Sequence, residues 1–143
     1  MAVLPQPFEI LVEQAQDRTV VEPHGELDLY SALQLKDKLL SLFGAGHTDI
    51  VLDLNHLDFM DSNGLGVCIE AFKRARREGG TLKLACSRKH LSRMFSITGL
   101  DKVFSIYDTV EDCFGETPTR LGTAARTESL RGQPGYAGRT GGG

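Results

Sequence analysis

The chain has 143 residues, of which 41% are hydrophobic and 24% are charged, a balance typical of one folded domain with its own apolar core. Its formal net charge of −3 argues against a general nucleic-acid-binding protein, which would carry an excess of basic residues. No apolar run approaches the ~20 residues that span a bilayer, and the N-terminus does not resemble a signal peptide. We therefore expect a cytoplasmic protein.

The first two elements are predicted to form an antiparallel β-hairpin, because residues 8–12 and 19–23 are rich in apolar and β-branched residues and a polar stretch separates them. Ser31 and Gln34 then form a possible capping box that would begin a helix. Apolar residues spaced by three and four continue this helix, and Gly44 or Gly46 can end it.

The middle of the chain predicts a buried strand followed by a second helix. Residues 50–54 are apolar almost throughout, as in a strand that is covered on both faces. The helix runs from about Ser62 to Glu78 with apolar residues on one face. Its last turns carry four basic residues, which the helix dipole favours there, so they do not indicate nucleic-acid binding.

The remaining elements continue the alternation of strand and helix. Residues 82–86 predict a fourth strand, and Ser87 can cap a short third helix. Residues 103–106 predict a fifth strand, and a final helix begins at Asp108 or Thr109. Helices that link strands imply parallel neighbours, so the predicted class is α/β, with a mixed sheet of about five strands and about four packed helices.

Composition divides the chain into residues 1–114, the folded domain, and residues 115–143, a tail. The tail contains eight of the sixteen glycines, together with four arginines and two glutamates. It has no Ile, Val, Phe or Cys, so it cannot bury enough apolar surface to offset the entropy of ordering. We expect the tail to be disordered.

Cysteines and histidines give no sign of a metal or disulfide site. The three cysteines are odd in number and far apart, and each lies in an apolar pattern, which favours buried, unreactive thiols. The four histidines show no metal-ligand spacing either; they are His24, His47, His56 and His90. The sequence therefore predicts no metal and no cofactor.

Ser62 is the candidate functional residue, because it lies where the buried strand has ended and the second helix begins. A phosphate on Ser62 would meet the free N–H groups and the partial positive charge of the helix N-terminus. Asp28, Asp58 and Asp61 are expected nearby, so a partner that fits a neutral serine would be repelled by the added charge. The residues alone leave other roles open for both positions. Ser62 can be only an N-cap, and Asp61 can be a cap or a catalytic carboxylate.

Several of these segments resemble the STAS domain of bacterial anti-sigma factor antagonists. The matching motifs are Gly25-Glu26-Leu27-Asp28, residues 50–54 and residues 59–67, with weaker matches at residues 80–84 and 97–104. They occur in the family's order and cover about residues 8–114. The resemblance implies a mixed sheet with an antiparallel first hairpin and helices packed on it.

The resemblance also implies a function. Ser62 matches the family's phosphorylated serine, and Asn63 stands where the family often has Ser or Thr, so Ser62 is the only phosphoacceptor in the loop. The unmodified protein would bind an anti-sigma factor with a GHKL-type serine kinase domain and release the sigma factor. Phosphorylation would end binding, and a PP2C-type phosphatase would restore it. The implied partner-binding residues are Asp28, Asp61, Ser62, Asn63, Gly64 and Leu65.

Two other functions must be weighed against a phosphorylation-controlled antagonist. A STAS domain can be an unphosphorylated subunit of a transport or scaffold complex, although the Asp61-Ser62 pair favours the regulatory branch. An enzyme that uses Asp61 would need a phosphate-binding lysine or a metal-ligand cluster, and neither is evident. We therefore expect a binding protein that has no catalytic residues and that contacts neither nucleic acid nor membrane.

Overall fold

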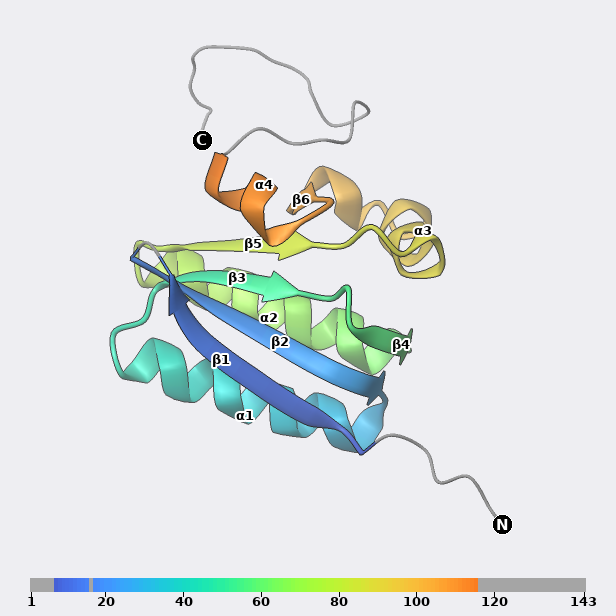
Figure 1. The fold of residues 1–143 in the computed structure, drawn as a ribbon, viewed down its shortest axis with the longest axis horizontal. Helices are drawn as coiled ribbons and strands as arrows, with labels where there is room; N and C mark the ends of the chain where they lie inside the picture. The colour runs from blue at the N-terminus through green and yellow to red at the C-terminus, as the bar shows by residue number, and fades with distance from the viewer. Residues whose placement is uncertain (1–6, 16, 116–143) are drawn as a thin grey trace.

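The structure is a computed structural model that describes residues 7–15 and 17–115 (Figure 1). The predicted tail, apart from Gly115, lies outside these residues. Within them the sheet has six strands: β1 (Glu9–Ala15), β2 (Arg18–Leu27), β3 (Asp49–Asp53), β4 (Leu57–Met60), β5 (Thr81–Ala85) and β6 (Ser105–Tyr107). The helices are α1 (Leu29–Gly44), α2 (Ser62–Arg77), α3 (Lys89–Ile97) and α4 (Val110–Gly115), with a 3₁₀ turn η1 (Leu100–Lys102).

The sheet is mixed, as the sequence predicts. Its strand order is β1-β2-β3-β5-β6, and β4 pairs with β2 beyond the end of β3. β1 and β2 form the predicted antiparallel hairpin, and all other neighbours are parallel. The prediction of about five strands missed β4, which has only four residues, two of them exposed.

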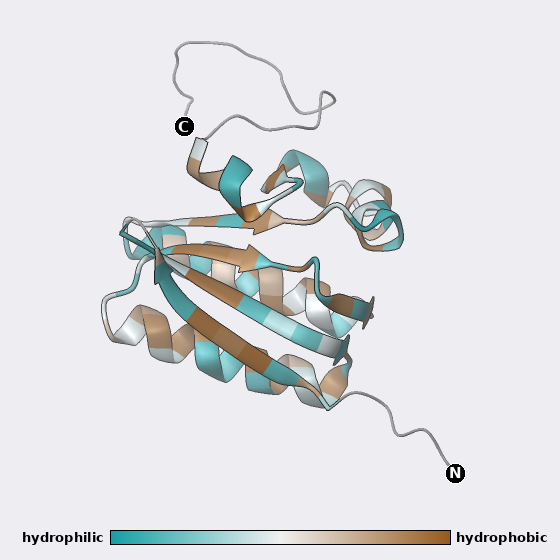
Figure 2. Ribbon diagram, in the orientation of Figure 1, coloured by the Kyte–Doolittle hydropathy of each residue, from teal (hydrophilic) through white to brown (hydrophobic). Residues whose placement is uncertain are grey.

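Helices cover the two faces of the sheet unequally. In Figure 1, α1 and α2 lie behind the sheet, and their apolar side chains pack against Val21, Leu52 and Leu84 in the larger core. On the opposite face, Cys113 of α4 joins Val51 in a smaller core. Figure 2 shows the consequence for the sequence: β3 and β5 are largely hydrophobic, whereas α1 alternates between hydrophobic and hydrophilic residues.

The three cysteines are buried, as predicted. Burial raises the pKa of the Cys68 and Cys113 thiols to about 12, which leaves them protonated and unreactive at neutral pH. Among the described residues, no helix has both the length and the apolar character needed to cross a membrane.

The predicted start of the third helix was wrong in detail. Arg88 precedes α3, and no side chain caps this helix. The hydroxyl of Ser87 instead donates to the Asn55 side-chain oxygen at 3.1 Å, and the Ser87 N–H donates to the same oxygen at 2.7 Å. Ser87 therefore ties the end of β5 to the loop after β3, a contact that no local pattern predicts.

Candidate functional site

Two helices begin side by side at the carboxyl ends of β2 and β4, which form one edge of the sheet. β2 and β4 are paired up to Leu27 and Met60, and the Asp61 N–H donates to the Leu27 carbonyl at 3.2 Å. The next residues, Asp28 and Asp61, leave the sheet together and begin α1 and α2 (Figure 1). The pairing of the two strands therefore places two aspartates and two helix N-termini at the same edge.

Asp28, not Ser31, is the N-cap of α1, so the predicted helix start was wrong. The Asp28 carboxylate accepts hydrogen bonds from the N–H groups of Tyr30 at 3.0 Å and Ser31 at 3.1 Å. The Ser31 hydroxyl accepts from the Asp28 N–H at 2.8 Å and completes a capping box. The chain turns directly after β2, which brings the helix start three residues closer to the strand than the Ser31-Gln34 pair predicts.

These hydrogen bonds make the Asp28 cap dependent on pH. The Ser31 N–H and then the Ser31 hydroxyl stabilise the ionised form and hold the pKa of the Asp28 carboxyl below its usual 3.8. A carboxyl with a lowered pKa in the folded state stabilises the fold above pH 3.8, and this contribution is lost as the pH falls through the folded-state value.

Asp28→Asn tests this dependence, because asparagine can still cap a helix but does not ionise. We expect wild type to have the higher free energy of unfolding at neutral pH, and the difference to shrink as the pH falls below 3.8. Urea denaturation of both proteins across this range measures the difference. A difference that does not change with pH would contradict the stated role of the carboxylate.

Asp61 is the N-cap of α2, and Ser62 is its first helical residue. The Asp61 carboxylate accepts from the Asn63 N–H at 2.9 Å. Of the alternatives that the sequence left open, the cap role of Asp61 is confirmed, and the cap role of Ser62 is wrong. The side chains of Ser62 and Asn63 are exposed. The Ser62 hydroxyl is therefore accessible at the positive end of a 16-residue helix.

Gly64 and Leu65, which the resemblance also includes, are buried beneath this exposed pair. A Cβ atom at Gly64 would overlap the Met60 side chain and lie 2.8 Å from Cδ2 of Leu27. The missing side chain thus lets the first turn of α2 pack directly on the ends of β2 and β4. The packing of Gly64 and Leu65 against the sheet fixes the position of the first turn of α2, which carries Ser62.

Large apolar side chains are exposed on the elements that meet at this edge. Leu29 and Tyr30 begin α1, Leu33 follows one turn later, and Phe59 lies on β4. Tyr30 is 75% exposed and Phe59 is 45% exposed. Exposed aromatic and aliphatic side chains of this size are typical of protein-binding surfaces. Asp58 is also exposed, which adds negative charge near the two capping aspartates.

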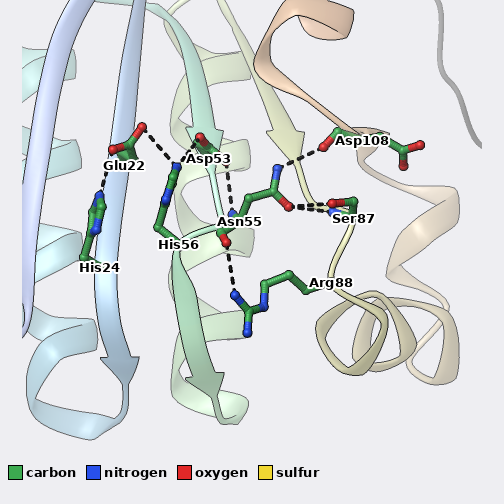
Figure 3. Close-up of polar contacts among 8 residues, drawn as sticks. All are labelled: Glu22, His24, Asp53, Asn55, His56, Ser87, Arg88 and Asp108. Carbon is green, nitrogen blue, oxygen red and sulfur yellow. Dashed lines mark hydrogen bonds and ion pairs between the residues drawn. The ribbon is translucent and has the colours of Figure 1, made fainter. Parts of the chain in front are cut away.

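A second polar cluster lies on the sheet and was missed by sequence reasoning (Figure 3). Nε2 of His24 lies 2.7 Å from one oxygen of Glu22, and Nε2 of His56 lies 3.4 Å from the other. Nε2 of His56 also lies 3.3 Å from Asp53. The two imidazole rings are stacked, with centroids 4.6 Å apart. Strand pairing brings together residues that are distant in the sequence, so the spacing of the histidines along the chain gave no sign of this cluster.

Asp53, the last residue of β3, and Asn55, in the turn that follows, support this cluster. Burial, the largest cause, raises the pKa of the Asp53 carboxyl, while the Asn55 N–H, which donates to it at 3.0 Å, acts in the opposite direction. The Asn55 side chain donates to the Asp108 carbonyl at 2.9 Å (Figure 3). Asn55 thereby fixes the loop that carries His56.

A mixed sheet with an antiparallel first hairpin and packed helices is the fold that the resemblance to the STAS domain implies. Comparison with known families agrees: the STAS domain matches residues 9–113. The chain belongs to the STAS domain family.

Several named relatives and solved structures are similar to this chain. The anti-sigma-B factor antagonist of Bacillus subtilis is 40% identical over 95 residues, which are 66% of this chain and 86% of the relative. An anti-sigma factor antagonist from Mycobacterium paratuberculosis has a similar structure, with a TM-score of 0.72 and 27% identity over 79% of this chain and 97% of that one. The Bacillus cell fate determinant SpoIIAA, solved in its phosphorylated form, shares the fold, with a TM-score of 0.61 and 23% identity over 76% of this chain and 98% of that one.

Proposed function

We propose that this chain is an anti-sigma factor antagonist whose binding to its partner is controlled by phosphorylation of Ser62. The observation that carries the proposal is the exposed Ser62 hydroxyl at the N-terminus of α2, directly after the capping carboxylate of Asp61 and beside that of Asp28. The relatives support the binding role, because both the Bacillus subtilis protein and the Mycobacterium paratuberculosis protein are named as anti-sigma factor antagonists.

In the unmodified state, the edge around Ser62 contacts the anti-sigma factor. Asp28, Asp61, Ser62 and Asn63 provide polar contacts, and the exposed side chains of Tyr30 and Phe59 provide apolar area. Aromatic side chains at the centre of an interface contribute much of its binding free energy, and polar groups around them fix its geometry. Binding to this surface competes with the sigma factor and releases it.

The phosphorylated state keeps the fold but loses the interface. A phosphate on the first residue of α2 lies near the partial positive charge of the helix N-terminus, so the helix tolerates it. The same phosphate adds about −1.5 to −2 units of charge beside two carboxylates. A partner surface that fits a neutral hydroxyl would have to desolvate this charge and accept its repulsion, so the complex dissociates.

The chain is the substrate of a kinase and of a phosphatase and is not itself a catalyst. The kinase domain of the anti-sigma factor, of the GHKL type, transfers the γ-phosphoryl group of ATP to Oγ of Ser62. The bond from the phosphorus to ADP breaks, the bond to Oγ forms, and the hydroxyl proton leaves. A PP2C-type phosphatase hydrolyses the phosphoserine and restores the binding form. All three proteins act in the cytoplasm.

Release of the sigma factor tests this function. The complex of the anti-sigma factor with its sigma factor is mixed with increasing amounts of the unmodified chain and separated by size-exclusion chromatography. We expect free sigma factor to appear together with a complex of the chain and the anti-sigma factor. A sigma complex that persists at a large excess of the chain would contradict the proposal.

A further inference from the structure

We propose that Glu22, His24 and His56, together with Asp53, form a binding site for a divalent transition metal of the zinc type. This site is separate from the Ser62 edge in its residues and chemistry, and the inference does not rest on the proposed function.

The backbone brings the two histidines together. His24 lies on β2 and His56 lies in the turn before β4, and these two strands are parallel neighbours. The Gly25 N–H points at the His56 carbonyl, at a distance of 3.4 Å, so the two histidines lie side by side where the pairing begins. Glu22 precedes His24 by two residues on β2 and therefore points to the same face of the sheet.

The distances between the side chains suit a metal. One ligand atom from each of Glu22, His24 and His56 lies within 4.8 Å of the others. Zinc binds nitrogen and oxygen ligands at about 2.0–2.2 Å in a tetrahedron, which places neighbouring ligand atoms about 3.3 Å apart. The contacts of His56 with Glu22 at 3.4 Å and with Asp53 at 3.3 Å are close to this value. The contact of His24 with Glu22 is shorter, at 2.7 Å, and the two stacked rings must rotate before both Nε2 atoms face one cation.

The donor atoms and charges also suit zinc. Two imidazole nitrogens and a carboxylate oxygen form a ligand set that zinc uses in proteins. Glu22 and Asp53 supply two negative charges, which a divalent cation neutralises. The Asp53 side chain is only 6% exposed, so a cation would compensate a carboxylate that has little contact with water.

The site is open on one side, so a metal can enter. Glu22, Asp53 and His56 line a hollow of about 440 Å³ that extends towards α4. The side chains of His24 and His56 are 33% and 42% exposed. Metal sites with three or four protein ligands and an open position can also hold water or a further ligand.

Metal binding to the untagged full chain tests the proposal. After treatment with a chelator, the wild-type chain is titrated with ZnCl₂ in an isothermal calorimeter. We expect one bound Zn²⁺ per chain. His24→Ala and His56→Ala are each expected to weaken binding by at least about tenfold, because each removes one ligand. His90→Ala is the matched control, since His90 is an exposed histidine outside the cluster, and it is expected to bind as wild type does.

A second measurement on the wild-type chain decides the question if a variant does not fold. One equivalent of Zn²⁺ is expected to raise the midpoint of thermal unfolding and to shift the imidazole NMR signals of His24 and His56. Three results would overturn the proposal: no binding to wild type, unchanged binding in His24→Ala and His56→Ala, or shifts confined to the signals of His47 and His90.

Discussion

Ser62→Asp is expected to weaken binding to the anti-sigma factor roughly 100-fold, about 2.7 kcal/mol, whereas Ser62→Ala is expected to bind as tightly as the unmodified chain. The aspartate would place a third carboxylate beside Asp28 and Asp61 in the centre of the proposed interface. Its charge is tolerated by the helix N-terminus but must be desolvated when a partner covers it. Isothermal calorimetry with the purified anti-sigma factor measures both affinities.

A matched control separates the effect of position from the effect of charge. Ser41 is an exposed serine near the end of α1, remote along that helix from Asp28. Ser41→Asp adds the same charge and is expected to leave the affinity within about twofold of wild type, because exposed charges outside an interface are screened. Equal losses in Ser41→Asp and Ser62→Asp would mean that net charge, and not phosphorylation at the helix start, controls binding.

Gly80→Ala is expected to lower the free energy of unfolding by about 3 kcal/mol, at the upper end of overpacking substitutions. A Cβ atom at Gly80 would overlap the carbonyl oxygen of Thr48 and lie 2.6 Å from its carbonyl carbon. Both are backbone atoms, so no side chain can rotate away. The same carbonyl accepts from the Thr81 N–H at 3.0 Å, so moving it also disturbs the start of β5. Urea denaturation measures the change.

Gly66→Ala provides the control for this substitution. Gly66 is exposed on α2, and a Cβ atom there would have no atom within 4 Å. Alanine is favoured over glycine inside a helix, so we expect the free energy of unfolding to rise by about 0.5–1 kcal/mol. If both substitutions changed stability in the same direction, the close approach of residues 48 and 80 would not be the cause.

Periodic burial made most of the fold predictable from the sequence. The apolar run at residues 50–54 predicted the central strand, and the spacing of Cys68 and Ala75 on one face predicted α2. These patterns are local, because each residue of a regular element points in a direction that its position alone determines. β4 was missed because its pattern is too short to recognise: it has four residues, and only Leu57 and Met60 are buried.

The details of the site depend on contacts that are not local. Asp28 and Ser31 can each cap a helix, and the end of β2 decides between them because the chain must turn there. His24 and His56 are far apart in the sequence, and only the pairing of β2 with β4 brings them together. The strand and helix patterns correctly placed Ser62 at the start of α2, but its exposure depends on how Gly64 packs on the sheet.

Phosphate mapping tests the central claim most directly. The chain is incubated with its anti-sigma factor kinase and ATP, and the phosphorylated residue is located by mass spectrometry of peptides. We predict one phosphate, on Ser62, together with loss of binding to the kinase, and no phosphate on Ser62→Ala. A phosphate on another residue while Ser62 stays unmodified would contradict the account.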